Sequence, residues 1–97
     1  MINNLISIII INYNGKTWLE KLFDSLLSQT YKKFEIIFID NNSQDNSVEF
    51  VKNNYSDNRI KIIQSKTNIG FAGGNNLALQ YAQGSYILLL NNRPFSW

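Results

Sequence analysis

The middle of the chain reads Phe34-Glu35-Ile36-Ile37-Phe38-Ile39-Asp40-Asn41-Asn42-Ser43, an apolar run that ends in small polar side chains. A short run rich in β-branched and aromatic residues is typical of a buried parallel strand. The pattern recurs where Ser7–Ile11 meets Asn12-Tyr13-Asn14 and where Tyr86–Leu90 meets Asn91-Asn92. Open α/β sheets bind ligands at the edge shared by the carboxyl ends of their strands. The three runs therefore predict a ligand site at one edge of a sheet.

Helical and strand patterns alternate along the rest of the chain. We expect strands over residues 5–11, 34–40, 59–64 and 86–90, and helices over 16–28, 46–54 and from the Gly-rich segment 66–76 onward. The last helix should carry Leu77, Leu79, Tyr81 and Ala82 and end at Gly84, and Pro94 should end the last strand. Crossovers of this length require parallel neighbours, joined right-handedly. The simplest result is a three-layer, Rossmann-like α/β half domain with sheet order 3-2-1-4, a single domain over residues 1–97.

Three side chains have expected local roles. Trp18 belongs to the apolar face of the first helix, so we expect it to pack on the sheet. Ser43 or Asp45 is expected to cap the second helix, because their oxygens can accept hydrogen bonds from free N–H groups in its first turn.

Composition and charge exclude several classes of function. The formal charge of +2 with scattered Lys and Arg gives no sign of a nucleic-acid partner. Without Cys or His, disulfides, thiolate or imidazole metal ligands and Ser-His-Asp chemistry are excluded. No apolar run approaches the roughly 20 residues that span a bilayer, and no signal peptide is visible at Met1. We therefore expect no transmembrane segment and a cytoplasmic protein.

Each candidate at the predicted edge has two interpretations from the residues alone. Asp40 can accept hydrogen bonds from a ribose diol or a base N–H, or it can order Asn42 and Ser43 through an Asx turn. Tyr13 can contact a nucleobase or be a core tyrosine with a satisfied hydroxyl. The segment 68–76 can bring its backbone close to an anionic ligand, or it is ordinary turn chemistry at a helix start.

Five segments, in this order, resemble the N-terminal part of the family 2 glycosyltransferases, which are inverting enzymes of GT-A fold that use nucleotide-sugar donors. They are residues 7–15, 25–31, 34–45, 68–76 and 84–92. The form Asn68-Ile69-Gly70-Phe71-Ala72-Gly73-Gly74-Asn75-Asn76 is most similar to the branch that includes rhamnosyltransferases. The resemblance implies a truncated GT-A domain that is incomplete at its C-terminal end.

The resemblance also implies roles by position. The end of the first strand, Ile11 to Asn14, would line the base pocket, with Tyr13 near the nucleobase. Asp40 and Asn41 would contact the base and ribose. The complete set of implied substrate-binding residues is Ile11, Asn12, Tyr13, Asn14, Asp40, Asn41, Asn42, Asn68, Gly70, Phe71, Gly73, Asn75, Asn76, Asn91 and Asn92.

One departure from the family pattern affects metal chemistry. Family members continue after Leu90-Asn91-Asn92 with an Asp that ligates a divalent cation on the donor diphosphate, and this chain has Arg93 there. Mg²⁺ and Mn²⁺ require oxygen ligands, so we assign no metal ligand here, although the complete family enzyme is expected to use one of them. Arg93 can contact a diphosphate through its guanidinium fork, or it belongs to a truncated or frame-altered terminus.

No residue matches the family's downstream catalytic base, so we assign no catalytic residue. The expected function is weak binding of a UDP- or dTDP-type nucleotide-sugar, with little turnover by this chain alone. The full-length parent would be cytoplasmic, either free or peripheral to the membrane. One alternative is an interaction module that forms a homo-oligomer through exposed sheet edges. Another is a flavodoxin-like protein binding a different phosphate ligand, which the lack of a Ser/Thr-rich phosphate loop after the first strand disfavours.

Overall fold

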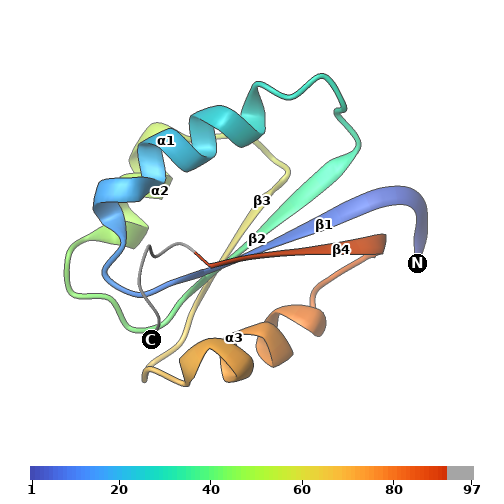
Figure 1. Ribbon diagram of the computed structural model, residues 1–97. Coiled ribbons are helices and arrows are strands. Elements are labelled where there is room, and N and C mark those ends of the chain that lie inside the picture. Colours follow the sequence, from blue (N-terminus) through green and yellow to red (C-terminus); the bar gives the residue numbers. More distant parts are fainter. Residues whose placement is uncertain (92–97) are drawn as a thin grey trace.

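The computed structural model describes residues 1–91, with Asn91 described by its backbone only; Asn92, Arg93 and Pro94 lie outside the described residues. Seven elements follow one another within this range (Figure 1). The strands are β1 (Ile2–Asn12), β2 (Phe34–Asp40), β3 (Ile60–Gln64) and β4 (Gly84–Asn91), and the helices are α1 (Lys16–Leu27), α2 (Ser47–Asn54) and α3 (Gly70–Leu79). The expected alternation of strand and helix is confirmed.

The four strands form one parallel sheet in the order β3-β2-β1-β4. Helices α1 and α2 cover one face of this sheet and α3 covers the other (Figure 1). The predicted three-layer α/β architecture with order 3-2-1-4 is therefore confirmed. Because β1 lies between β2 and β4, the strand order reverses beside it, and the carboxyl ends of β1 and β2 face the same edge of the molecule.

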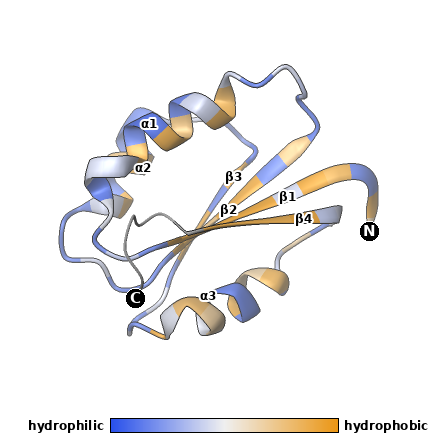
Figure 2. Cartoon of the chain, viewed as in Figure 1, coloured by the Kyte–Doolittle hydropathy of each residue, from blue (hydrophilic) through white to orange (hydrophobic). Residues whose placement is uncertain are grey.

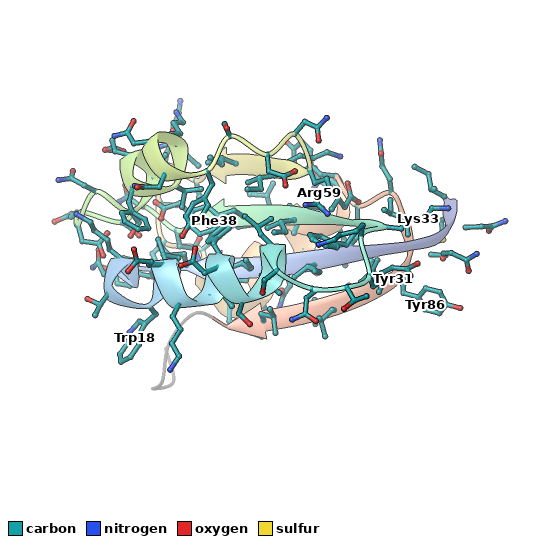
Figure 3. The ribbon with its side chains drawn as sticks, turned by 90° about the horizontal axis from the view of Figure 1, so that it is seen from above. Trp18, Tyr31, Lys33, Phe38, Arg59 and Tyr86 are labelled. Carbon is teal, nitrogen blue, oxygen red and sulfur yellow. The ribbon has the colours of Figure 1, made fainter. Side chains whose placement is uncertain are left out.

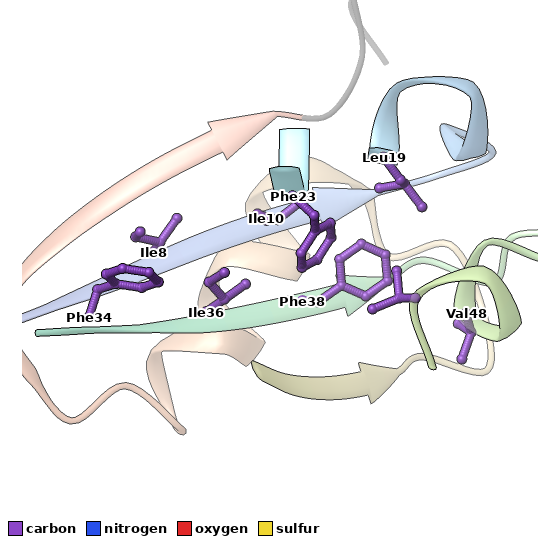
Figure 4. Packing of buried hydrophobic residues seen from close by; sticks show 9 residues of the cluster. Ile8, Ile10, Leu19, Phe23, Phe34, Ile36, Phe38 and Val48 are labelled. Atoms are coloured by element: carbon purple, nitrogen blue, oxygen red, sulfur yellow. The ribbon is translucent and has the colours of Figure 1, made fainter. Parts of the chain in front are cut away.

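Side chains of the two central strands alternate between two apolar layers, as the pleat of a strand requires. Ile8 and Ile10 of β1 join Ile36 and Phe38 of β2 beneath α1 and α2 (Figure 4). The ring of Phe23 from α1 meets Phe38 edge-on at 5.8 Å between centroids. On the other face, buried isoleucines of β1 and β2 pack against Ala78 of α3. Figure 2 shows that apolar residues are concentrated in the strands and on the helix faces turned toward them.

A buried polar cluster on β1 and β2 forms hydrogen bonds with the connection between α3 and β4. The carboxylate of Glu35 accepts hydrogen bonds from Ser7 Oγ at 2.6 Å, Lys61 Nζ at 2.9 Å and the Gln83 N–H at 2.7 Å. Ser7 Oγ in turn accepts the N–H of Gly84 at 2.9 Å. Burial of Glu35 opposes its ionisation, but the hydrogen bonds from Gln83, Ser7 and Lys61 outweigh burial and hold the pKa of Glu35 below its ordinary value.

The elements near β4 differ from the expectation at their ends. Helix α3 ends at Leu79, so Tyr81 and Ala82 lie beyond it, and Gly84 is the first residue of β4 rather than the end of the helix. Strand β1 begins at Ile2, earlier than predicted, because its start pairs with Gly84. A Cβ on Gly84 would lie 2.5 Å from the carbonyl oxygen of Leu5, so glycine is required there by the close approach of two strands.

The predicted packing of Trp18 on the sheet is wrong. Its side chain is 47% exposed, and it projects away from the sheet in Figure 3. Leu19 and Phe23 of the same helix are completely buried and occupy the contact with the sheet. The apolar face of α1 is therefore narrower than helical spacing alone indicated. Among the described residues, no helix has the length and apolar character needed to cross a membrane.

Candidate functional site

The carboxyl ends of β1 and β2 are joined at one edge of the sheet. Asn12 and Asp40 are paired across the two strands, and the N–H of Asn41 donates to the carbonyl oxygen of Asn12 at 2.8 Å. On the far side of β2, the N–H of Ser65 donates to the carbonyl oxygen of Asp40 at 2.8 Å. We call this edge, with the loops 12–16, 40–47 and 65–70, the rim. Two of the three polar strand ends in the sequence thus meet there; the third is at Asn91, of whose side chain nothing is described.

Asp40 is held by three donors at the rim. Its Oδ1 accepts from Asn12 Nδ2 at 2.9 Å and from Ser43 Oγ at 2.7 Å, and its Oδ2 accepts the N–H of Ser43 at 2.9 Å. The bond to the Ser43 N–H orders the loop after Asp40, as one interpretation of this residue expected, but it closes three residues on and not two, as an Asx turn would. A carboxylate accepts about four hydrogen bonds, so Oδ2 has capacity for one more.

The sequence singled out Ser43 only as a turn residue or helix cap, and did not indicate that its hydroxyl links the two loops of the rim. Its hydroxyl donates to Asp40 and accepts from Asn12 Nδ2 at 3.2 Å and from the N–H of Asn14 at 2.9 Å. We expected Ser43 or Asp45 to cap α2, but Ser43 points to the rim instead, and Asp45 Oδ1 accepts the N–H of Ser47 at 3.1 Å. The signal available in the sequence was the polar tetrad Asp40–Ser43 opposite Asn12-Tyr13-Asn14.

Further bonds fasten the loop after β1 to the loop after β2. Asn14 Oδ1 accepts the N–H of Gln44 at 2.8 Å, and Asp45 Oδ2 accepts the N–H of Lys16 at 2.9 Å. Asn14 and Asn42 adopt left-handed backbone conformations, with φ of 52° and 66°. Asparagine tolerates this region better than most residues because its side chain is short and polar. The abundance of asparagine at the rim is thus explained partly by backbone geometry.

Asn41 ties the end of β2 to the start of α3. Its side chain is completely buried, its Nδ2 donates to the carbonyl oxygen of Gly70 at 3.0 Å, and its Oδ1 accepts the N–H of Ile69 at 3.4 Å. Gly70 has a φ of 76°, a conformation that favours glycine. At Gly74, a Cβ would lie 3.0 Å from Ile11, so this glycine lets α3 approach β1 closely. The start of the segment 68–76 therefore lies at the rim, and from Gly70 onward the segment is part of α3.

The predicted site residues differ in their accessibility. Ile11, Asn12, Asp40 and Asn41 are buried and form the floor of the rim. Four of the predicted residues are exposed at the rim or on α3: Asn14, Asn42, Asn68 and Asn76. Five are half-buried: Tyr13, Gly70, Phe71, Gly73 and Asn75.

Two of the half-buried residues have particular surroundings. Phe71 packs against the apolar layer of β1 and β2, so at least part of its ring is core. The Oδ1 atom of Asn75 is buried and has no hydrogen-bond partner among the described residues. Asn91 is placed only as the strand partner of Ile11, and Asn92 is not described.

The described part of the rim contains no cluster of potential metal ligands. Within residues 1–91, no group of three or more Asp, Glu, His or Cys residues is placed to hold a metal ion. The rim carboxylates of Asp40 and Asp45 are engaged with backbone and side-chain donors.

The sequence of the chain is similar to those of known proteins. The family model described as glycosyl transferase family 2 matches residues 7–92, which includes every loop of the rim. The chain belongs to this family. The family resemblance read from the five sequence segments is therefore confirmed.

Two relatives have similar sequences. An uncharacterized glycosyltransferase of Haemophilus influenzae is 40% identical over 92 residues, which is 94% of this chain and 37% of that protein. A UDP-Glc:alpha-D-GlcNAc-diphosphoundecaprenol beta-1,3-glucosyltransferase of Escherichia coli is 42% identical over 93 residues, 94% of this chain and 36% of that protein. The chain thus spans little more than a third of the length of these relatives.

Solved structures share the fold. Residues 1–349 of Staphylococcus aureus TarS in complex with UDP-GlcNAc superpose with a TM-score of 0.83 at 28% identity, over 90% of this chain and 26% of that chain. The mannosyltransferase PcManGT of Pyrobaculum calidifontis, in complex with GDP-Man and Mn²⁺, superposes with a TM-score of 0.81 at 23% identity, over 90% of this chain and 27% of that chain.

Proposed function

We propose that this chain is the nucleotide-binding part of an inverting family 2 glycosyltransferase and that its rim binds the nucleotide of a UDP- or dTDP-type sugar donor. The observation that carries this proposal is the joining of three loops, after β1, after β2 and before α3, by the side chains of Asn12, Asp40, Ser43 and Asn41. The complex of TarS with UDP-GlcNAc supports the ligand class.

The rim offers complementary groups for a nucleotide. Tyr13 is half-buried between Asn12 and Asn14, where its ring can contact the face of a base. Oδ2 of Asp40 can accept one further hydrogen bond, from a base N–H or a ribose hydroxyl. The exposed amides of Asn42 and Asn68 can donate to ribose or phosphate oxygens. A rim fastened before binding loses little conformational entropy when the ligand arrives.

We propose that the chain alone binds this ligand weakly and does not transfer sugar. No residue matches the family's catalytic base, whose loss typically lowers the rate about 10²–10⁴-fold. Arg93 stands where the family has a metal-ligating Asp, and residues 1–91 gather no metal site. Transfer of a sugar to an acceptor with inversion would be the activity of a complete family enzyme, and the chain spans little more than a third of the length of the relatives it matches.

Calorimetric titration with UDP, dTDP and GDP tests this proposal, each with and without Mn²⁺. We expect UDP or dTDP to bind with a dissociation constant of about 0.1–1 mM, ~4–5.5 kcal/mol of binding free energy, and to bind equally well without Mn²⁺. Binding that requires Mn²⁺ would contradict the loss of the metal site. No heat from any nucleotide at millimolar concentration would contradict the nucleotide site itself.

The exposed faces of β4 favour a second candidate, an interaction module. Ile87 and Leu89 on one face and Tyr86 and Leu88 on the other are all more than 40% exposed, from 42% for Ile87 to 61% for Tyr86. An apolar groove of about 290 Å³ adjoins this strand, lined mainly by Ile6, Ile8, Leu26, Phe34 and Leu88. Exposed apolar strands favour pairing with another chain. Light scattering separates the two candidates: a dimer that ignores nucleotides favours this one, and a monomer that binds them favours the first.

A further inference from the structure

We infer that Ser43 is the positioning residue of the rim, because its one hydroxyl fixes both Tyr13 and Asp40 in the orientation that nucleotide binding needs; the inference rests on the proposed function. Ser43 lies on the loop after β2, at the side of the rim where the loop after β1 arrives. The nucleotide contacts proposed above belong to Tyr13, Asp40, Asn42 and Asn68, and Ser43 acts on two of these groups.

The hydroxyl of Ser43 is fully used. A serine hydroxyl has one donor and two acceptor positions. Its donor is directed to Asp40 Oδ1, and its acceptor positions are occupied by Asn12 Nδ2 and by the N–H of Asn14. With no position left for a ligand atom, Ser43 is suited to hold other groups in place.

The three partners of Ser43 surround the proposed base-binding groups. Asn12 and Asn14 are the chain neighbours of Tyr13, and both are bonded to the same oxygen. Ser43 thus holds the backbone just after Tyr13, through the N–H of Asn14, and the side chain just before it, through Nδ2 of Asn12. Asp40, the proposed acceptor for the nucleotide, is held by the Ser43 hydroxyl at Oδ1 and by the Ser43 N–H at Oδ2. One residue thus links the loop that carries Tyr13 to the Asp40 carboxylate.

The consequences of removing the hydroxyl can be localised. In Ser43→Ala, the N–H of Asn14 loses its acceptor and Asp40 Oδ1 loses a donor, whereas Asn12 keeps its bond to Asp40. The strand pairing of β1 and β2 is unaffected, since it uses backbone groups only. We therefore expect a folded protein with a loosened loop after β1.

The experiment compares Ser43→Ala and Ser43→Thr with the wild-type chain by UDP titration and by amide hydrogen exchange at Asn14 and Gln44. Ser28→Ala is the matched control, because the Ser28 hydroxyl is exposed and bonds only locally, to the carbonyl oxygen of Ser25. For Ser43→Ala we expect about a tenfold weaker UDP affinity and about tenfold faster exchange at Asn14, the size of a lost hydrogen bond. Ser43→Thr, which keeps the oxygen, should restore both to within about threefold.

The outcomes separate this inference from the proposed function. Unchanged UDP affinity in Ser43→Ala, with faster exchange at Asn14, would overturn the positioning role while leaving the nucleotide site intact. If the wild-type chain binds no UDP, the proposed function fails, and the positioning role for the nucleotide fails with it. In that case faster exchange at Asn14 would still establish Ser43 as the fastener of the two loops, and unchanged exchange would remove that role too. If Ser43→Ala does not fold, Ser43→Cys replaces it, since sulfur is only a weak acceptor.

Discussion

Asn12 Nδ2 lies 2.9 Å from Asp40 Oδ1, and the two residues are register partners on adjacent parallel strands. The pair closes the edge of the sheet where β1 and β2 end, with Asn12 completely buried and Asp40 only 2% exposed. Three donors, from Asn12 and Ser43, fix the orientation of this carboxylate. The rim of this family 2 chain is therefore held by hydrogen bonds between the protein's own loops.

Asp40→Asn should destabilise the chain and weaken nucleotide binding. The new amide either turns its NH₂ group toward Asn12 and Ser43, which are donors to Oδ1, or toward the Ser43 N–H at Oδ2. We expect a loss of about 1–3 kcal/mol in the free energy of unfolding, the cost of an unsatisfied buried group, measured by urea denaturation. Asp24→Asn is the control, because Asp24 is exposed and its amide can still accept from the Tyr55 hydroxyl. Equal effects of the two substitutions would contradict the special role of Asp40.

Glu35→Gln should lower stability at neutral pH and much less in acid. The pKa of Glu35 is lowered in the folded protein, by hydrogen bonds that outweigh its burial. Its stabilising contribution is therefore complete above the ordinary value of 4.5 and is lost as the pH falls through the lowered folded pKa. We expect a cost of about 1.5–3 kcal/mol at pH 7, as for hydrogen bonds to a charged group. Urea denaturation of both proteins from pH 7 to pH 3 measures this difference, which should shrink toward acid.

The exposed Glu20 provides the control for that series. Glu20→Gln should change the free energy of unfolding by less than about 0.5 kcal/mol at every pH, as is usual for surface substitutions. A difference between wild type and Glu35→Gln that stays constant from pH 7 to pH 3 would show that the Glu35 carboxylate does not contribute through its charge.

Gly84→Ala should destabilise the chain at the joint between β1 and β4. The added Cβ would lie 2.5 Å from the Leu5 carbonyl oxygen and 2.8 Å from the Ser7 nitrogen, both of them backbone atoms of β1. We expect a cost of about 1–3 kcal/mol from overpacking, seen as a lower midpoint of thermal unfolding. Gly73→Ala is the comparison: its Cβ would lie 3.0 Å from Cβ and 3.2 Å from Cγ1 of Ile69, a milder crowding than the backbone contacts at Gly84, and alanine favours a helix. A midpoint for Gly84→Ala at or above that of Gly73→Ala would contradict this reasoning.

Replacing Ile87 and Leu89 together by Lys should change stability by less than about 1 kcal/mol and should improve solubility. Both side chains are about half exposed on the α3 side of β4, so charge there costs little burial. Light scattering over a concentration series measures the mass of the particles. If the wild-type chain self-associates through β4, the double variant should be monomeric. Leu79→Lys, at an equally exposed position at the end of α3, should leave any association unchanged; an equal effect of both would argue against β4 as the contact.

The fold was predictable from the sequence because its signals are local and repeated. The runs in β1, β2 and β4 contain few polar residues and were recognisable as strands, and the lengths of their connections allow only parallel pairing. The predicted burial of the third run is wrong: β2 is buried throughout, whereas residues 86–89 of β4, an edge strand, are 42–61% exposed. The end of α3 and the role of Gly84 were not predictable, because a strand start and a helix end both use glycine. The distinction depends on the approach of the Leu5 backbone.

The candidate site was predictable in its location but not in its internal bonding. The polar ends of β1 and β2 indicated the rim, yet nothing local separates a ligand-binding Asp40 from one that organises Ser43. The organising role of Asp40 becomes visible only in the structure, where the Ser43 hydroxyl accepts hydrogen bonds from Asn12 and Asn14, which are distant in the sequence. Trp18 was misplaced for a similar reason, since the width of the contact under α1 is set by Leu19 and Phe23.

Titration of the ¹⁵N-labelled chain with UDP, followed by amide chemical shifts, tests the central claim that the rim is the nucleotide site. We predict that the shifts which change with UDP cluster at residues 12–14, 40–43 and 68–70, with little change at Leu88 or Leu26, which line the apolar groove. Shifts confined to β4 and the groove, or none at all at millimolar UDP, would contradict it.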